Sequence, residues 1–76
     1  MKSYTYRVFD SVSTVLFAAR QVERNGIECK VVPIPRQFSS DCGVCLRNMT
    51  DTDSEVVRVL NGRGLRETDV HRLELA

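Results

Sequence analysis

Alternation of apolar and polar side chains predicts four β-strands along the chain. The first, YTYRVF, is rich in aromatic and β-branched residues, which favour strands. In the second, Ile27, Cys29 and Val31 alternate with charged residues up to Pro33. We expect that strand to stop at Pro33, because proline has no N–H to donate to a ladder. The predicted strands cover residues 4–9, 27–32, 43–48 and 69–75.

Two segments between these strands carry apolar residues at helical spacing. The first follows an N-cap at Asp10-Ser11 and ends at Asn25-Gly26, where glycine can adopt the left-handed conformation. Its expected buried face consists of Val12, Val15, Leu16, Ala19 and Val22, opposite Arg20, Gln21, Glu23 and Arg24. The second begins at a capping box, Thr52-Asp53-Ser54-Glu55, and ends at Asn61-Gly62.

The resulting order, β-α-β-β-α-β, predicts an α+β fold of the ferredoxin-like, split βαβ type. Such a fold is an antiparallel four-stranded sheet with both helices packed on one face. Right-handed crossovers place the first and third strands in the centre of the sheet. With 76 residues and no linker, we expect one domain over residues 1–76.

Composition narrows the function classes. Hydrophobic residues make up 42% of the chain and charged residues 28%, which is typical of a folded globular domain. A net charge of +1 gives no global field for a polyanion, so we expect no nucleic-acid partner. No apolar run is long enough to cross a bilayer, and strand-like alternation begins at the N-terminus without a signal core. We therefore expect a cytoplasmic protein without a membrane partner.

The three cysteines are the main candidates for chemistry. An odd number cannot form a complete disulfide framework, so we expect reduced thiols. If Cys42-Gly43-Val44-Cys45 were extended, its two cysteine Cα atoms would lie roughly 10 Å apart, too far for a disulfide. A zinc site needs four ligands, and one CxxC with Cys29 and His71 on other strands does not complete one. We expect no metal and no cofactor, Cys29 on the core face, and His71 partly buried with a hydrogen-bond partner.

Cys42 occupies a different setting, at the junction of a proline-containing loop and the third strand. Gly43 after it lets a ligand or another backbone approach closely. Arg36 in the same loop would stabilise a thiolate, whereas neighbouring Asp41 would raise the pKa of the Cys42 thiol. These two effects oppose each other. Both a reactive Cys42 and a half-buried structural thiol in a turn remain open.

The chain resembles the small-domain family of selenium/sulfur carrier-like proteins, formerly a domain of unknown function. The resemblance runs from YRVFDSVSTVLFAARQVERNGIECKVVPIPRQFSSDCGVCLR to the last strand. Three features carry it: Ala18-Ala19 in the first helix, the NGI turn, and above all the block P-x-P-R-x-x-S-S-x-C-G. That block consists here of Pro33, Pro35, Arg36, Ser39, Ser40, Cys42 and Gly43.

This resemblance implies a Cys-Gly centre at Cys42 that carries sulfur or selenium as a persulfide or perselenide. It also implies a cysteine desulfurase or a selenium donor protein as one partner and an unknown acceptor as the other. For such a carrier, which would not itself be an enzyme in the strict sense, we expect anion-stabilising groups at Arg36, Ser39, Ser40 and Gly43. Cys45 is not part of the family pattern, so it either resolves a persulfide on Cys42 or packs.

A second hypothesis is a non-catalytic ligand-binding or protein-interaction module in which CGVC is structural. Ferredoxin-like folds host many unrelated functions, so the fold does not decide between the two. The sheet face without helices should present Cys45 and Arg47 together with Glu28 and Lys30, and it could pair with a partner or with a second protomer in a homodimer. The third strand lacks the aromatic residues that stack RNA bases in one variant of this topology.

Overall fold

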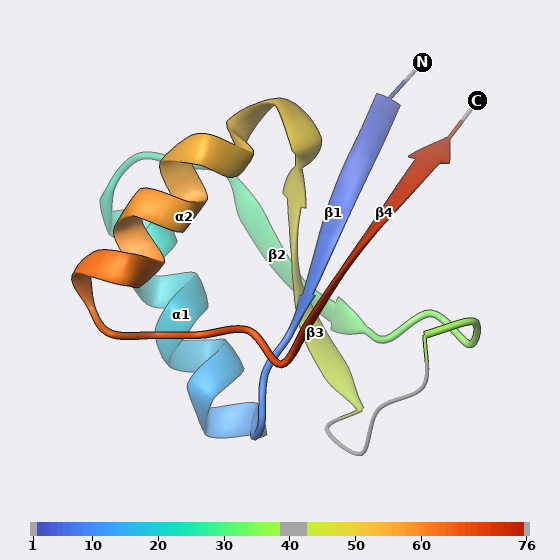
Figure 1. The fold of residues 1–76 in the computed structure, drawn as a ribbon, viewed down its shortest axis with the longest axis horizontal. Coiled ribbons are helices and arrows are strands. Elements are labelled where there is room, and N and C mark those ends of the chain that lie inside the picture. The colour runs from blue at the N-terminus through green and yellow to red at the C-terminus, as the bar shows by residue number, and fades with distance from the viewer. Residues whose placement is uncertain (1, 39–42, 76) are drawn as a thin grey trace.

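The computed structural model describes residues 2–38 and 43–75 and has the predicted order of elements (Figure 1). The four strands form one antiparallel sheet in the order β2-β3-β1-β4, so β1 and β3 are central as predicted. The fold is therefore α+β and ferredoxin-like. A short 3₁₀ turn, Thr50–Thr52, precedes the second helix. The elements are β1 Lys2–Val8, α1 Val12–Arg24, β2 Cys29–Pro33, β3 Val44–Met49, α2 Asp53–Gly62 and β4 Asp69–Leu75.

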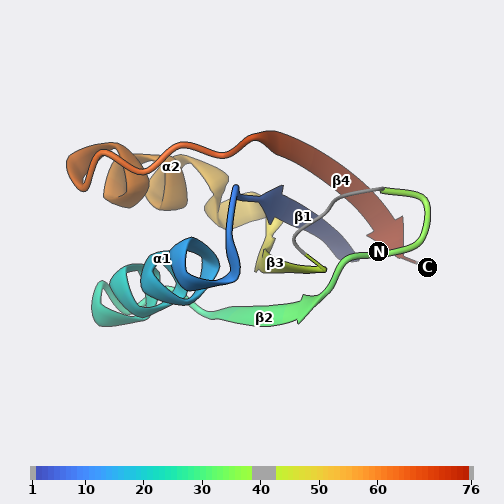
Figure 2. The same cartoon turned by 90° about the horizontal axis from the view of Figure 1, so that it is seen from below.

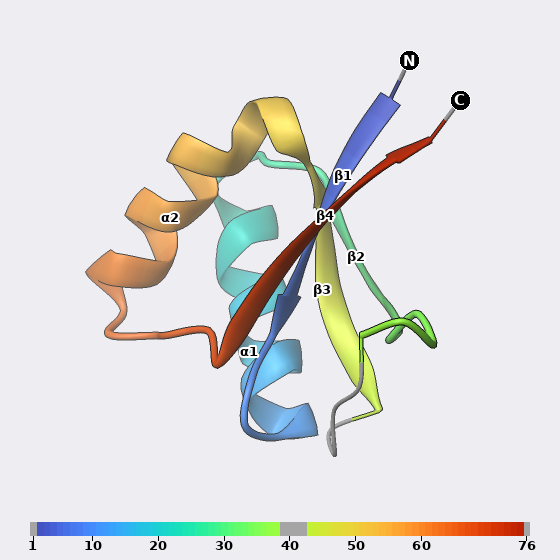
Figure 3. The same cartoon turned by 45° about the vertical axis from the view of Figure 1, so that its right-hand side comes forward.

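The molecule has two layers, with both helices on one face of the sheet (Figures 2 and 3). The described part of the β2–β3 loop lies beyond the opposite face, which we call the open face, and runs toward β4 (Figure 2). The sheet therefore has apolar contacts on both sides, although helices cover only one. The described part of the loop that carries the Cys-Gly block thus lies on the side of the sheet away from the helices.

The main core lies between the helices and the sheet. Leu46 on β3 is fully buried there, in one cluster with residues of both helices. Ile27 and Phe9, at the ends of connecting segments, belong to the same cluster. The remaining members of this core come from the two helices: Val15, Ala18, Ala19, Val22, Val56 and Leu60.

Helix α1 begins as predicted, because the Ser11 side chain accepts a hydrogen bond from the Thr14 N–H at 3.2 Å. Its buried face differs from the expected one. Val12 and Leu16 are 47% and 50% exposed, whereas Gln21 is buried. The helix contacts β2 and β3 on one side and α2 on the other. Because the helix packs against both neighbours, its buried face includes Ala18 and excludes Val12 and Leu16.

The capping box predicted for α2 does not form. Thr52 has a backbone conformation of φ −100° and ψ 6°, and its side chain makes no cap hydrogen bond. Its hydroxyl instead donates to the Met49 carbonyl at 2.7 Å, which stabilises the 3₁₀ turn. An N-cap residue needs an extended backbone to turn its oxygen onto the first helical N–H groups. Thr52 lacks that backbone conformation.

Strand β2 stops at Pro33 as predicted, and the proline itself is the last residue of the strand. The strand lies at the edge of the sheet and pairs with β3 alone. The next residue, Ile34, donates its N–H to the Gly43 carbonyl at 3.1 Å. Because alternate residues of an edge strand point their N–H groups outward, Pro33 occupies a position where no donor is needed.

Candidate functional site

The β2–β3 loop, which carries the Cys-Gly block, has both its ends fixed by the sheet. Pro33 pairs with Val44 in the ladder, and the Ile34–Gly43 hydrogen bond closes the loop one step further out. Within the loop, the Phe38 N–H donates to the Pro35 carbonyl at 2.9 Å and forms a turn. The segments on either side of Cys42 in the sequence are therefore held in defined positions.

Gly43 has φ +83°, a left-handed conformation that favours glycine. The strand begins after it, at Val44, and not at Gly43 as expected. A positive φ at Gly43 means that residues 42–45 are not one extended segment. The Cα separation of roughly 10 Å expected for an extended segment therefore no longer excludes a Cys42–Cys45 disulfide.

The predicted site residues have different surroundings. Arg36 and Gly43 are exposed. Cys45 lies on the open face as expected, but it is fully buried. Ser39, Ser40 and Cys42 lie outside the described residues.

Phe38 links the loop to the open face of the sheet. Its ring stacks on the His71 ring of β4, with centroids 4.0 Å apart and planes 4° from parallel. The Tyr6 ring of β1 lies 5.9 Å from Phe38 at a tilted angle. Phe38 and Ile34 pack against a second apolar cluster formed by Tyr6, Val8 and Cys45. This contact could not be predicted from the sequence, because Phe38 lies in a segment without periodicity.

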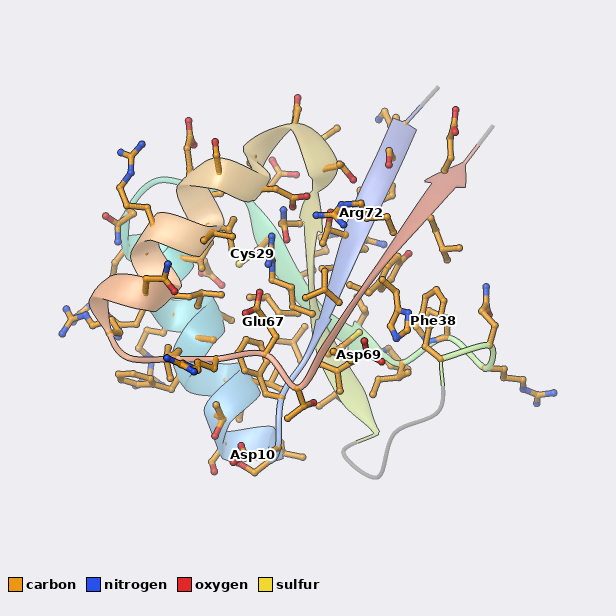
Figure 4. All side chains as sticks on the ribbon, in the orientation of Figure 1. Asp10, Cys29, Phe38, Glu67, Asp69 and Arg72 are labelled. Atoms are coloured by element: carbon orange, nitrogen blue, oxygen red, sulfur yellow. The ribbon has the colours of Figure 1, made fainter. Side chains whose placement is uncertain are left out.

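His71 is held on its other side by β4. Its Nε2 atom lies 2.9 Å from the Asp69 carboxylate, two residues earlier on the same face of the strand. Figure 4 shows Phe38 beside β4, close to Asp69. The prediction of a partly buried His71 is confirmed, and the polar group in contact with its ring is the Asp69 carboxylate.

Cys29 lies on the helix side, as predicted, and packs against the main core. Its Sγ–H donates to the Ala19 carbonyl at 3.7 Å. Burial, reinforced by the charge of Glu23, raises the pKa of the Cys29 thiol from 9.0 to about 11. A thiol with a raised pKa is mostly protonated at neutral pH and is a poor nucleophile.

A buried ionic cluster on the helix side was not predicted from the sequence. Arg7, on β1, is 2% exposed and contacts the carboxylates of both Asp53 and Glu67. Its Nε donates to the Asn48 side-chain oxygen at 3.0 Å. Thr5 and Asn48 donate to Asp53 at 3.0 and 2.8 Å. Throughout residues 2–38 and 43–75, every buried side-chain nitrogen and oxygen has a hydrogen-bond partner.

Asp53 is the centre of this cluster. Desolvation raises the pKa of its carboxyl, but hydrogen bonds from Asn48, Thr5 and Arg72 and the charge of Arg7 outweigh it, so the pKa lies below 3.8. One sequence signal could have revealed the cluster. Thr5 and Arg7 share one face of a strand expected at the centre of the sheet, and an arginine on a covered face needs buried polar partners, although alternation alone does not say which face the helices cover.

The uncovered half of the open face carries positive charge. Lys30 and Arg47 are directly opposite each other on β2 and β3. The Arg47 guanidinium lies 4.5 Å from the centre of the Tyr4 ring. Neither cation forms an ion pair with a carboxylate in the part of the chain that the structure describes. A shallow hollow beside them is lined by Tyr4, Glu28, Cys29, Lys30, Arg47, Asn48 and Met49.

Among the described residues, no three His, Cys, Asp or Glu side chains are grouped closely enough to hold a metal ion. Over the same ranges, neither helix has the length and apolar character needed to cross a bilayer. Both statements apply to residues 2–38 and 43–75, the part of the chain that the structure describes.

Comparison with known proteins identifies the family of the chain. A search of curated proteins and a search of solved structures found no match. A family model matches residues 4–72, which include both helices, the whole Cys-Gly block and most of the last strand. The resemblance noted from the Cys-Gly block is thereby confirmed, and the chain belongs to the family described as "Putative Se/S carrier protein-like".

Proposed function

We propose that the protein is a sulfur or selenium carrier that holds its cargo on Cys42. The observation that carries the proposal is the state of the other two thiols in a chain of this family. Cys45 is fully buried, and Cys29 is hydrogen-bonded with a pKa of about 11. A carrier needs an accessible thiolate, which neither residue offers. Cys42 is the remaining cysteine.

The transfer step is a thiolate exchange. The Cys42 thiolate attacks the terminal sulfur of a donor's persulfide, the donor S–S bond breaks, and the donor thiolate leaves. The product is Cys42-S-SH, or Cys42-S-SeH when the donor holds selenium. The donor cysteine is reduced as Cys42 becomes the new persulfide, so no external oxidant is required.

The loop residues of the family block would assist this exchange. Arg36 is exposed in the described part of the loop, where its guanidinium can approach an anionic cargo. The N–H of exposed Gly43 and the hydroxyls of Ser39 and Ser40 are the other donors in this role. The proposed donor partner is a cysteine desulfurase or a selenium donor protein, acting in the cytoplasm, with a separate acceptor protein.

Sulfur loading tests the proposal. The reduced protein is incubated with a cysteine desulfurase and cysteine, and peptide mass spectrometry then locates added sulfur. We expect one added sulfur atom on Cys42, and loss of that adduct in Cys42→Ser. Cys29→Ser is the matched control and should load like the parent protein. No adduct on Cys42, together with resistance of Cys42 to alkylation, would contradict the proposal.

A second candidate function is a protein-interaction module. It is favoured by the position of Lys30 directly opposite Arg47 on the neighbouring strand. Like charges directly opposite each other destabilise a sheet, and an acidic segment of a partner would offset this cost. Under this hypothesis Cys42 reacts slowly and Cys42→Ser leaves partner binding unchanged. Charge reversal in Arg47→Glu would then abolish partner binding, whereas sulfur loading from small-molecule persulfide would be unaffected.

A further inference from the structure

The open face contains a contact whose position suggests a role in choosing which thiol is loaded. Phe38 belongs to the loop, four residues before Cys42 in the sequence, and its stacking partner His71 belongs to β4. Loop and sheet are thus joined by a ring stack between residues 33 positions apart in the chain. Beneath the same loop lies Cys45, with no exposed surface.

We propose that the stack of Phe38 on His71 is a latch that closes the loop over Cys45 and so restricts cargo loading to Cys42. The inference rests on the proposed carrier function. His71 is a positioning residue in it, because it acts through Phe38 and has no contact with cargo.

The geometry supports a latch in three ways. First, the two rings are nearly parallel at 4.0 Å, and Tyr6 contacts Phe38 at a tilted angle, so the Phe38 side chain is held by two strands. Second, the Asp69 carboxylate contacts Nε2 of His71 and fixes the orientation of the imidazole ring. Third, the Ile34–Gly43 hydrogen bond tethers the base of the loop, and the Phe38 ring holds the described part of the loop at a second point.

The consequence for chemistry concerns external persulfides. A donor persulfide exchanges with any thiolate it can reach, and the two cysteines of CGVC are only three positions apart. Ile34 and Phe38 pack against the cluster that contains Cys45, whose side chain has no exposed surface, so the closed loop keeps Cys45 away from donor proteins. Sulfur or selenium is therefore loaded on one cysteine only. A carrier needs such a single loading position because its acceptor must find the cargo in one defined place.

The first experiment measures the accessibility of Cys45 in unloaded Cys42→Ser protein, by the rate of alkylation under native conditions. A buried thiol reacts through local opening, so weakening the latch raises the rate. We expect His71→Ala to accelerate alkylation of Cys45 roughly three- to tenfold, the factor that an aromatic pair contributes to an opening equilibrium. His71→Phe retains a flat stacking ring and should restore slow alkylation.

Cys29 serves as an internal control, because it lies on the helix side of the sheet. Its alkylation rate should be the same in all these variants. If the alkylation of Cys29 accelerates together with that of Cys45 in His71→Ala, the fold has opened globally. Substitutions on the loop side then decide the question. We expect fast alkylation of Cys45 in Phe38→Ala and slow alkylation in Phe38→Tyr. An unchanged Cys45 rate in Phe38→Ala, or equal rates in His71→Phe and His71→Ala, would overturn the latch.

The second experiment uses protein with Cys42 intact and the desulfurase loading assay. Added sulfur should appear on Cys42 alone in the parent protein, and on both Cys42 and Cys45 in His71→Ala. Loading that stays confined to Cys42 in His71→Ala would overturn the role in loading. If the parent protein takes up no sulfur at all, the proposed function fails, while the Cys45 alkylation rates still decide whether the latch exists.

Discussion

Arg7 in β1 and Asp53 at the start of α2 form a 2.8 Å ion pair under the helix side of the sheet. The pair joins the central strand β1 to the second helix. Arg7 is almost fully buried, so the pair is held in surroundings of low polarity. Removing one member leaves the other charge without its main partner.

Arg7→Ala should lower the free energy of unfolding by about 3–5 kcal/mol, because Asp53 and Glu67 would lose a buried counter-charge. Urea denaturation followed by circular dichroism measures the change. Arg66→Ala, at an exposed position, is the matched control and should change stability by less than about 0.5 kcal/mol. Similar small effects of both substitutions would contradict the structural role of Arg7.

Stability should fall in acid partly through Asp53. Because the folded-state pKa of Asp53 lies below 3.8, its contribution is fully present above the unfolded-state pKa and is lost as the pH falls through the folded-state pKa. The free energy of unfolding should therefore decrease between about pH 5 and pH 2 more steeply in the parent protein than in Asp53→Asn. Exposed Asp51 provides the comparison, and Asp51→Asn should retain the parent slope.

Cys29 should react slowly in the folded protein. A thiol pKa of about 11 in place of 9.0 reduces the thiolate fraction at neutral pH, and the higher nucleophilicity of a more basic thiolate compensates in part. We expect alkylation of Cys29 about tenfold slower than that of an ordinary exposed thiol. Peptide mass spectrometry over a time course gives the rate. Glu23→Gln should accelerate the alkylation of Cys29 slightly, since the Glu23 charge is the smaller cause of the raised pKa. If Cys29 of the parent protein reacts as fast as an exposed thiol, its buried setting is contradicted.

Gly43→Ala should destabilise the fold by about 1 kcal/mol, because an alanine at φ +83° is strained. Apart from its two neighbours in the chain, no atom of the described residues lies within 4 Å of the position its Cβ would take, so we assign the cost to the backbone conformation. Thermal unfolding would show the change as a lower Tm.

Gly62→Ala is the matched control for this substitution. Gly62 is the last residue of α2, has no positive φ, and also has open space for a Cβ. Alanine there should leave stability unchanged or raise it by up to about 1 kcal/mol. A stabilising Gly43→Ala would mean that the loop does not need the left-handed conformation.

Periodic elements of this fold are readable from the sequence. The strand Asp69–Leu75 has the predicted bounds, and the Ser11 cap and the central positions of β1 and β3 are as expected. These features depend on local spacing, which a sequence displays directly. The first helix shows the limit of this approach: which of its residues are buried depends on the angle at which it meets two neighbours.

The surroundings of the candidate site were less predictable, because they depend on contacts between distant segments. Cys45 was correctly placed on the open face, but its burial was not expected, and Phe38, which packs against the same cluster, lies in a segment without a pattern. Arg7 was read as one residue of an alternating strand, and its partners Asp53 and Glu67 come 46 and 60 positions later. The family block identified the loop itself, and the structure adds which groups hold that loop on the sheet.

The proline at the end of β2 has a consequence for assembly. Sheet edges with free N–H groups recruit further strands from other chains, which leads to aggregation. At Pro33 the outer edge of β2 offers no donor, so an incoming strand would find a gap in the ladder just where the Cys-Gly loop begins. A single imino acid thus discourages fibre-like growth along that edge, next to the loop that carries the Cys-Gly block.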